Sequence, residues 1–431
     1  MPTGRYRSKI QRSIESQAPV SPAPDTSAIP SVECCGLAAP DVDAIRAYRL
    51  ERIRARLAEL DYAGIVVTDP INIRYATDSR NMQVWSMRNP MRYCFVATEG
   101  PVVLFEFMRC AHLSSHLPRV DEVRPAQPWL YMAVGRRMPE FALKWATELA
   151  GLVRSHGGGN VRLAVDRCNH EGVSALRQLG MDVRNGEDVM ECARAVKCAE
   201  EVNAMRCAVA ACDESLHVMR SKLEPGITEQ RLWSYLHAEN IARGGEWIET
   251  RLLASGSRTN PWYQECGDRK IEAGDLVAFD TDLIGAYGMC VDVSRTWLCG
   301  EVKPSEEQKE LYRMAYEQIR HNAGILKAGL SFREAAERAL PLGPDFLPNR
   351  YTLLYHGAGL ADEYPALFYP EDWPSAGYDG VLEANMVICV ESYIGRVGGK
   401  EGVKLEEQFL ITERGAEPLS TYPYEEKLGA W

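Results

Sequence analysis

Three aspartates lie close together in one apolar stretch of the chain, FDTDLIGAYGMCVDVSRT at residues 279–296. Burying a carboxylate without a partner costs free energy, and Asp280, Asp282 and Asp292 would also repel one another. A bound cation removes both costs because it compensates several carboxylates at once and holds them ionised. The GAYG segment predicts a turn that returns the chain and brings Asp292 beside the other two. We therefore interpret the stretch as part of a metal site.

Three further residues extend this candidate site. Glu391 follows the apolar run NMVICV, Glu406 follows GVKL, and His356 stands among apolar and small residues in LLYHGAGL. Each alone has an ordinary structural explanation, because charged groups are usually solvated or paired and a single histidine often packs in a core. Together with the aspartates they form a set of carboxylates with one imidazole, which we expect at the ends of strands. Oxygen-rich ligation with one nitrogen suits divalent Mn, Fe, Co or Zn.

The elements that position these residues belong to the second half of the chain. Strands are expected at DLVAFDTD, CVDVSRTWL, NMVICVESYI and EEQFLIT. Asp280 and Asp282 should share one face of the first strand because they are two residues apart. A helix with an apolar stripe from Val202 to Met219 precedes the strands, and SEEQKELYRMAYEQIRHNAGIL predicts another. Helices backing an antiparallel sheet make an α+β domain, which we place at residues 191–431.

The first half predicts a separate α/β domain at residues 41–190. DVDAIRAYRLERIRARLAEL has the apolar spacing of a helix, whereas AGIVVTDP, RYCFVATEGPVVLFEF and VRLAVDR are typical of strands. Residues 1–40 are rich in Pro, Ser and Ala, which indicates an extended arm that packs on a partner or stays mobile.

The chain as a whole limits the class of protein. Its 431 residues suggest two domains, and its net charge of −11 argues against a nucleic-acid partner. No apolar run approaches the roughly 18 residues of a membrane span, so no membrane partner is expected. Its 13 cysteines form no C-x-x-C pair, which favours reduced thiols and a cytoplasmic location.

The order Asp, Asp, His, Glu, Glu, with VDVSRTW after the aspartates and GVKLEEQFLIT around the last glutamate, resembles the pita-bread metalloenzymes. That family includes methionine aminopeptidase, prolidase and creatinase, and the resemblance covers roughly residues 42–425. AGIVVTDPINIRYATDSRNMQ is similar to the N-terminal domain of the creatinase and prolidase branch. The resemblance implies a creatinase-like first domain, a pita-bread catalytic second domain, and a homodimer in which the first domain caps the partner's active site.

Two positions depart from the peptidases of this family. The peptidases carry a histidine shortly before the first metal aspartate, where SGSRTNPWYQECGDR has Trp262, and a second one after the metal histidine, where HGAGLADEYP has Asp362. Because an indole does not transfer protons and an aspartate is a different base, hydrolysis of a peptide bond is not expected. The peptidases also space their two aspartates eleven apart, whereas Asp292 lies twelve residues after Asp280 and ten after Asp282. We expect both to coordinate, around a single metal rather than a pair.

FDTDLIGAYGMCVDVSRTW together with HGAGLADEYP is similar to the dimethylsulfoniopropionate lyases of the same fold, which release dimethyl sulfide and acrylate. This resemblance implies a carbon–sulfur lyase with a small zwitterionic sulfonium substrate, and it favours iron, with zinc or manganese as alternatives. Asp362 is then the base that removes the α-proton. Dimethyl sulfide leaves as a neutral molecule, so no general acid is required.

Aromatic residues near these motifs are expected to hold the sulfonium group. Trp262, Tyr263 and Tyr351 are the main candidates, because an aromatic face attracts onium ions by about 0.5–2 kcal/mol. Tyr355 and Trp373 are further candidates. Plain core packing is the alternative for Trp262.

Other interpretations of the site remain open at this level. Asp362 would orient a metal ligand if it is not the base, and Arg295 in VSRT is expected to pair with a metal carboxylate. The alternative function is a prolidase- or creatinase-type metallohydrolase acting on a small C–N substrate. A non-catalytic pita-bread module is the third possibility, and the retained ligand set argues against it.

Overall fold

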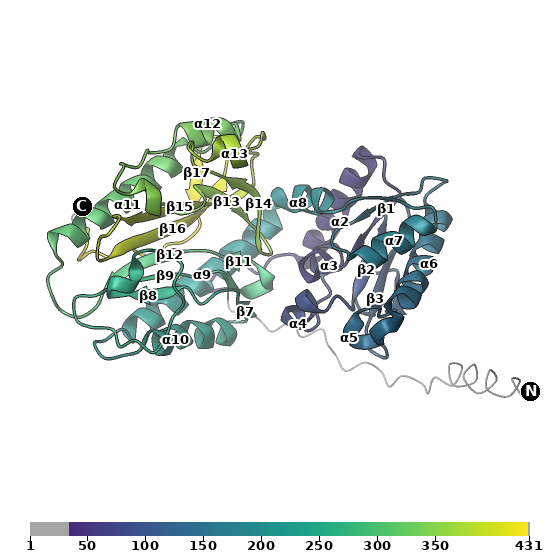
Figure 1. Ribbon diagram of the computed structural model, residues 1–431, viewed down its shortest axis with the longest axis horizontal. Coiled ribbons are helices and arrows are strands. Elements are labelled where there is room, and N and C mark those ends of the chain that lie inside the picture. The colour runs from purple at the N-terminus through teal and green to yellow at the C-terminus, as the bar shows by residue number, and fades with distance from the viewer. Residues whose placement is uncertain (1–33, 430–431) are drawn as a thin grey trace, which may run out of the picture.

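Two lobes of different architecture are joined by helices in the middle of the chain (Figure 1). The computed structural model describes residues 34–429, so the expected arm at 1–40 falls mostly outside the described residues. Within them, Cys34 is buried and its Sγ lies 3.5 Å from the hydroxyl of Tyr287, so this end of the arm packs on the second lobe. None of the described helices is long and apolar enough to cross a membrane.

The first lobe is built on a mixed six-stranded sheet in the order β4-β3-β2-β1-β5-β6. One hydrophobic cluster holds α2 and α3 against one face, and a second holds α6 and α7 against the other. The expected α/β architecture is therefore confirmed. The strands are β1 (Gly64–Val67), β2 (Tyr93–Ala97), β3 (Val102–Glu106), β4 (Glu122–Pro125), β5 (Arg162–Val165) and β6 (Asp182–Asn185). The helices are α2 (Val42–Glu59), α3 (Pro70–Thr77), α4 (Gln83–Arg88), α5 (Tyr131–Val134), α6 (Met138–His156), α7 (His170–Gln178) and α8 (Glu187–Ala195).

Helix α2 begins where the sequence predicts. The carboxylate of Asp41 accepts hydrogen bonds from the backbone N–H groups of Asp43 and Ala44, which caps the first turn. The face that the apolar spacing predicts is buried, including Ile53 and Leu57. The predicted domain boundary at residue 190 falls within α8 and stays a prediction.

The second lobe holds a five-stranded sheet in the order β14-β13-β15-β16-β17 and a three-stranded sheet in the order β12-β9-β8. A third sheet has the order β11-β10-β7. Helix α11 packs on β15 and β16, and β12 contacts β16, so the two larger sheets share one core. The strands are β7 (Trp247–Ile248), β8 (Leu253–Ser255), β9 (Leu276–Asp280), β10 (Leu283–Ile284), β11 (Cys290–Val291), β12 (Ser294–Leu298), β13 (Tyr355–Ala358), β14 (Asp362–Leu367), β15 (Val387–Gly395), β16 (Gly402–Ile411) and β17 (Ala416–Pro418). The helices are α9 (Ala199–Ser221), α10 (Glu229–Ala242), α11 (Glu306–Ile325), α12 (Phe332–Glu337) and α13 (Trp373–Ala376).

One expectation about these strands is wrong. β9 ends at Asp280, and Asp282 lies beyond it with a φ of 36°, so the two aspartates do not share the face of one strand. A residue with a positive φ reverses the local chain direction. Such a φ is uncommon outside glycine, but aspartate tolerates it. Strands β13 and β14 are not among the four strand segments that the sequence analysis names for this lobe.

Candidate metal centre

The three aspartates converge as the sequence predicts. Ser294 of β12 stands opposite Asp280 of β9, and the short hairpin β10–β11 between these strands returns the chain. The hydroxyl of Thr281 donates to the carbonyl of Val291 at 2.8 Å, which fixes the two ends of the hairpin together. One carboxylate oxygen from each of Asp280, Asp282 and Asp292 then lies within 4.8 Å of the others.

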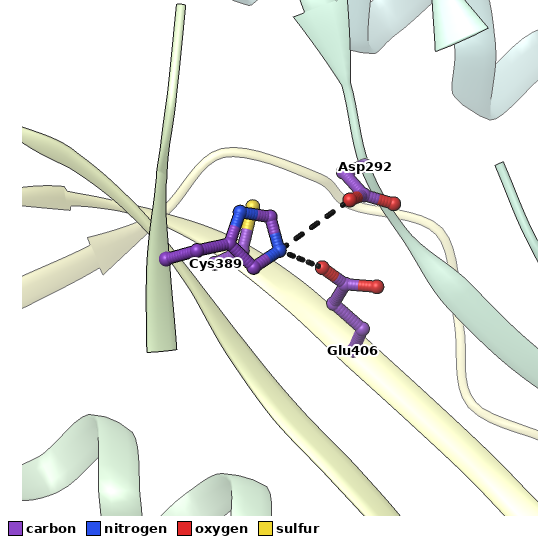
Figure 2. Close-up of side chains that lie close together, drawn as sticks. Asp292, Cys389 and Glu406 are labelled. Carbon is purple, nitrogen blue, oxygen red and sulfur yellow. Dashed lines mark ion pairs between the residues drawn. The ribbon is translucent and has the colours of Figure 1, made fainter. Parts of the chain in front are cut away.

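The other three candidates meet on the five-stranded sheet. Glu391 of β15 stands directly opposite Glu406 of β16. The Nε2 atom of His356, on β13, lies 3.5 Å from Glu391 Oε1. It also lies 3.3 Å from Glu406 Oε1 and 3.5 Å from Asp292 Oδ2 (Figure 2). All four side chains are buried. Contrary to expectation, the two glutamates and the histidine lie within strands rather than at their ends.

Cys389 also faces this cluster, which the sequence interpretation missed. It pairs with His356 across β13 and β15, and its Sγ lies within 4.8 Å of donor atoms of Asp292, His356 and Glu406 (Figure 2). The signal was present, because Cys389 is two residues before Glu391 on one strand and therefore shares its face. A thiolate is a soft donor, so it would shift the metal preference of the site toward iron, cobalt or zinc.

Unsatisfied oxygens indicate where a cation fits. Oε1 of Glu391 and Oε1 of Glu406 are buried and accept no hydrogen bond, although both point toward His356 Nε2. Burying such oxygens without a partner is costly, so an unpaired buried oxygen in a folded protein indicates a partner that the contacts so far do not include. Carboxylate oxygens converging on one imidazole nitrogen fit a divalent transition metal.

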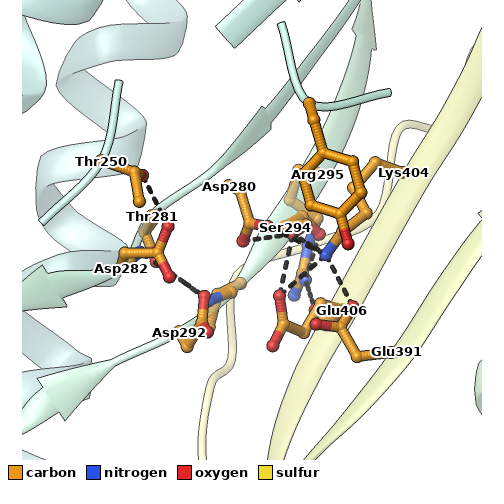
Figure 3. Close-up of polar contacts among 12 residues, drawn as sticks. Thr250, Asp280, Thr281, Asp282, Asp292, Ser294, Arg295, Glu391, Lys404 and Glu406 are labelled. Atoms are coloured by element: carbon orange, nitrogen blue, oxygen red, sulfur yellow. Dashed lines mark hydrogen bonds and ion pairs between the residues drawn. The ribbon is translucent and has the colours of Figure 1, made fainter. Parts of the chain in front are cut away.

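Lys404 is the second residue that the sequence interpretation missed. Its Nζ, fully buried, lies 2.6 Å from Glu391 Oε2, 3.0 Å from Glu406 Oε2 and 3.1 Å from Asp280 Oδ2 (Figure 3). It also donates to Ser294 Oγ at 2.7 Å. Lys404 is two residues before Glu406 on β16, so alternation along that strand could have indicated it.

Burial and mutual repulsion raise the pKa of several carboxylates of the cluster. Burial, and then the charges of Asp280 and Asp362, raise the pKa of Asp282 to about 9. Burial raises the pKa of Glu391 to about 7, with Glu406 adding to the effect and Lys404 opposing it. Burial would also raise the pKa of Glu406, but Lys404 and His356 outweigh it and hold that pKa well below its usual value. A metal ion would displace protons from these carboxylates and replace their charge.

Asp362, the predicted base, lies beside the cluster rather than within it. Its Oδ1 is 3.8 Å from His356 Nδ1 and accepts from the thiol of Cys290 at 3.6 Å. A β-bulge between His356 and Gly357 offsets β13 from β14 there. The Asp362 side chain is 43% exposed, whereas the cluster carboxylates are buried, so a substrate has access to it. Its pKa is raised by partial desolvation and by Glu406, with His356 opposing.

A buried ion cluster fixes the backbone next to Asp362. The fully buried carboxylate of Glu363 lies 3.0 Å from Arg194 Nε and 2.5 Å from Lys197 Nζ. Both cations come from the end of α8 and the segment before α9, where the two lobes join. The lobe junction therefore holds the start of β14 in place.

The aromatic candidates divide between the site and the core. The ring of Tyr351 lies 4.5 Å from Lys404 Nζ and stacks on the ring of Tyr263 at 5.2 Å. Tyr263 is 50% exposed, whereas Trp262 is buried and packs 6.0 Å from the Tyr393 ring. Tyr355 precedes His356 on β13 and points to the opposite, buried face, so its expected place in the site wall is wrong.

Two more expected positions are corrected by the packing. Trp373 is buried in the hydrophobic cluster that also contains Tyr355, on the face of β13 that points away from the candidate ligands. The guanidinium of Arg295 pairs with Glu407 at 2.7 Å and donates to the backbone carbonyl of Glu406. Arg295 therefore holds the backbone of β16, the strand that carries Glu406, instead of pairing with a carboxylate of the candidate metal site.

Comparisons with known proteins agree with this geometry. The model of metallopeptidase family M24 matches residues 203–413. The dimethylsulfoniopropionate lyase DddP of Roseovarius nubinhibens is 44% identical over 91% of this chain and 89% of its own length. The protein of the same name from Roseobacter denitrificans is 42% identical over 90% of this chain and 88% of its own length.

Solved structures of similar shape include peptidases. The Xaa-Pro dipeptidase from Bacillus anthracis superposes with a TM-score of 0.70 at 23% identity, covering 88% of this chain and 99% of its own. The prolidase from Pyrococcus horikoshii gives a TM-score of 0.69 at 20% identity, with 88% and 99% covered. At such identities the likeness concerns the fold, and it agrees with the pita-bread architecture expected for the second lobe.

Proposed function

The chain belongs to metallopeptidase family M24, among its dimethylsulfoniopropionate lyases, and from this premise we propose that it cleaves dimethylsulfoniopropionate to dimethyl sulfide and acrylate. The observation that carries the proposal is the 44% identity to a lyase over nearly the whole chain. Trp262 and Asp362 support it, because they stand where the peptidases are expected to carry proton-transferring histidines.

We propose that the six predicted ligands, Asp280, Asp282, Asp292, His356, Glu391 and Glu406, hold a divalent transition metal. The orphan oxygens of the two glutamates support this assignment. Iron is the favoured ion, with zinc or manganese as alternatives, since the donors are oxygens with one imidazole and a nearby thiol. When bound, the ion supplies Lewis-acid stabilisation for the negative charge that develops on the substrate carboxylate.

Asp362 is the base in this proposal. Its carboxylate is partly exposed beside the cluster, and its raised pKa increases its basicity. It takes the α-proton, the electrons of that C–H bond form the double bond of acrylate, and the electrons of the C–S bond leave with sulfur. The sulfonium charge is neutralised in that step, so dimethyl sulfide departs without a proton.

We further propose that Tyr263, Tyr351 and Trp262 form the wall around the sulfonium group. Lys404 already lies over the ring of Tyr351, so that face is occupied by a cation of the chain itself. Tyr263, half exposed and stacked on Tyr351, offers an accessible aromatic face. A cation–π contact of this kind contributes about 0.5–2 kcal/mol.

The quaternary state and the location are also proposals. Apolar side chains are exposed on the first lobe around α4 and α5: Met82, Val84, Met87, Met108, Tyr131 and Met132. A patch of this kind indicates an interface, and in a homodimer of the creatinase type this lobe would cover the partner's active site. The reduced cysteines support a cytoplasmic location.

Product analysis with competing substrates tests the function. Metal-loaded protein is incubated in parallel with dimethylsulfoniopropionate, glycyl-proline and creatine, and the products are followed by proton NMR. The proposal predicts vinyl signals of acrylate in the first sample and no change in the others. Free proline or a creatine breakdown product without acrylate would favour the metallohydrolase instead.

A further inference from the structure

The carboxylate of Asp362 accepts one hydrogen bond from the described residues, and its donor is a cysteine. Oδ1 of Asp362 accepts from the thiol of Cys290 at 3.6 Å. His356 Nδ1 lies 3.8 Å from the same oxygen, but it donates its proton to the carbonyl of Gly357 at 3.1 Å. Since 43% of the Asp362 side chain is exposed, its carboxylate could otherwise turn toward solvent. The direction of this carboxylate therefore depends on Cys290.

Cys290 has a well-defined position of its own. Its backbone N–H donates to the carbonyl of Gly359 at 2.8 Å, and its own carbonyl accepts from Gln408 Nε2 at 3.1 Å. It pairs with Ile284 across the β10–β11 hairpin, and it is only 1% exposed. Contacts to three separate segments hold the sulfur in place, so the thiol can serve as a fixed donor.

The same contacts relate the base to the predicted metal ligands. Cys290 is two residues before Asp292. Gln408, which binds the Cys290 carbonyl, is two residues after Glu406 on β16 and shares its face. The third contact is to the turn between β13 and β14, and Asp362 is the first residue of β14. The thiol therefore fixes the base relative to the strands that carry the ligands.

A thiol suits this task chemically. An S–H group is a weak donor, so it orients a carboxylate without strongly stabilising its charged form. A hydroxyl or ammonium donor would hold the carboxylate more firmly but would also weaken it as a base. Position matters because a base must lie within hydrogen-bonding reach of the proton that it removes, and a misplacement of about 1 Å can cost about 10²-fold in rate.

We propose that Cys290 is a positioning residue that orients the carboxylate of Asp362 toward the α-proton of the substrate. This inference rests on the proposed lyase function. Cys290 does not contact the substrate and forms no bond with it. Its S–H group engages Oδ1 of Asp362, which leaves Oδ2 as the atom that takes the α-proton.

A double-mutant cycle distinguishes this role from ordinary packing. Cys290→Ala is expected to lower kcat for dimethyl sulfide release by about 10-fold, with KM and metal content close to the wild-type values. In the Asp362→Asn background the same substitution should have no further effect, because the base that it orients is already lost. Cys290→Ser keeps a donor and should retain more activity than Cys290→Ala.

Cys212→Ala is the matched control. Cys212 is a buried cysteine of the same lobe, on α9, so its substitution removes the same sulfur and should leave kcat unchanged. Wild-type kcat in Cys290→Ala, or an equal loss in the wild-type and Asp362→Asn backgrounds, would overturn the proposal. Wild-type protein that makes no acrylate would fail the proposed function and this inference with it. An active wild type with an equally active Cys290→Ala would fail this inference alone.

The S–H stretching band gives a readout that does not require turnover. The infrared difference spectrum between wild type and Cys290→Ala isolates the band of this thiol, which should lie at a lower frequency than that of a thiol without an acceptor. Asp362→Ala removes the acceptor and should move the band to higher frequency. A band that Asp362→Ala leaves in place would contradict the contact. If Cys290→Ala does not fold, Cys290→Ser replaces it in the cycle and in the difference spectrum.

Discussion

Replacing Asp362 with asparagine separates chemistry from metal binding. Asn has nearly the same shape as Asp but does not act as a carboxylate base. The Asp362 side chain is 43% exposed and lies 3.8 Å from His356 Nδ1, outside both groups of possible ligands. The Asp362→Asn protein should therefore fold, keep its metal and bind substrate.

The size of the effect follows from the role. A positioned general base contributes about 10²- to 10⁴-fold to a rate, which corresponds to a barrier about 3–5 kcal/mol higher once it is removed. We expect the rate of dimethyl sulfide release by Asp362→Asn to fall by that factor, with metal content per chain unchanged. The assay is initial-rate gas chromatography of the headspace, combined with elemental analysis of the same preparation.

A matched substitution in the ligand set serves as the control. Asp282→Asn changes another aspartate near the site, and it should lower metal content and activity together. An Asp362→Asn protein that retains nearly full turnover would refute Asp362 as the base. Loss of metal in proportion to the loss of rate would assign it instead to orienting a ligand.

Three further predictions concern the metal, the substrate wall and pH. His356→Ala should lower metal content, because His356 is the nitrogen donor of the cluster, and an unchanged stoichiometry by elemental analysis would contradict this. Trp262→Ala should raise the apparent KM for the sulfonium substrate by about 2- to 30-fold with a smaller change in kcat, in line with a cation–π contact; an unchanged KM would refute a contact there. Metal-free protein should lose stability as pH rises from 6 to 9, because raised pKa values of about 7 for Glu391 and about 9 for Asp282 mean that the folded state binds more protons than the unfolded one. Thermal unfolding across that range checks the sign, and a Tm that rises with pH would contradict it.

Much of the fold was predictable because its signals are local. The capped amphipathic helix α2 and the apolar strands β1, β15 and β16 follow directly from periodicity and composition. The carboxylates proposed as metal ligands were singled out because several carboxylates in apolar segments are costly without a cation. Their convergence on His356 is long-range, and it was inferred from the order of motifs rather than from any local signal.

What escaped prediction depends on tertiary packing. β14 forms through its pairing with β13, and the sequence analysis names no strand there. Tyr355 and Trp373 face the core because of strand direction and packing that their residue types do not encode. Lys404 and Cys389 share strand faces with Glu406 and Glu391, so alternation indicates their direction, but only the pairing of β13 with β15 brings Cys389 beside His356.

The most direct test of the central claim is headspace gas chromatography with dimethylsulfoniopropionate, before chelation, after chelation and after metal is restored. The account predicts dimethyl sulfide from the purified protein, its disappearance with chelator and its return with Fe²⁺, Zn²⁺ or Mn²⁺, because the ion stabilises the charge formed when the α-proton leaves. Protein with its metal confirmed by elemental analysis that releases no dimethyl sulfide, or releases it equally after chelation, would contradict a metal-dependent lyase.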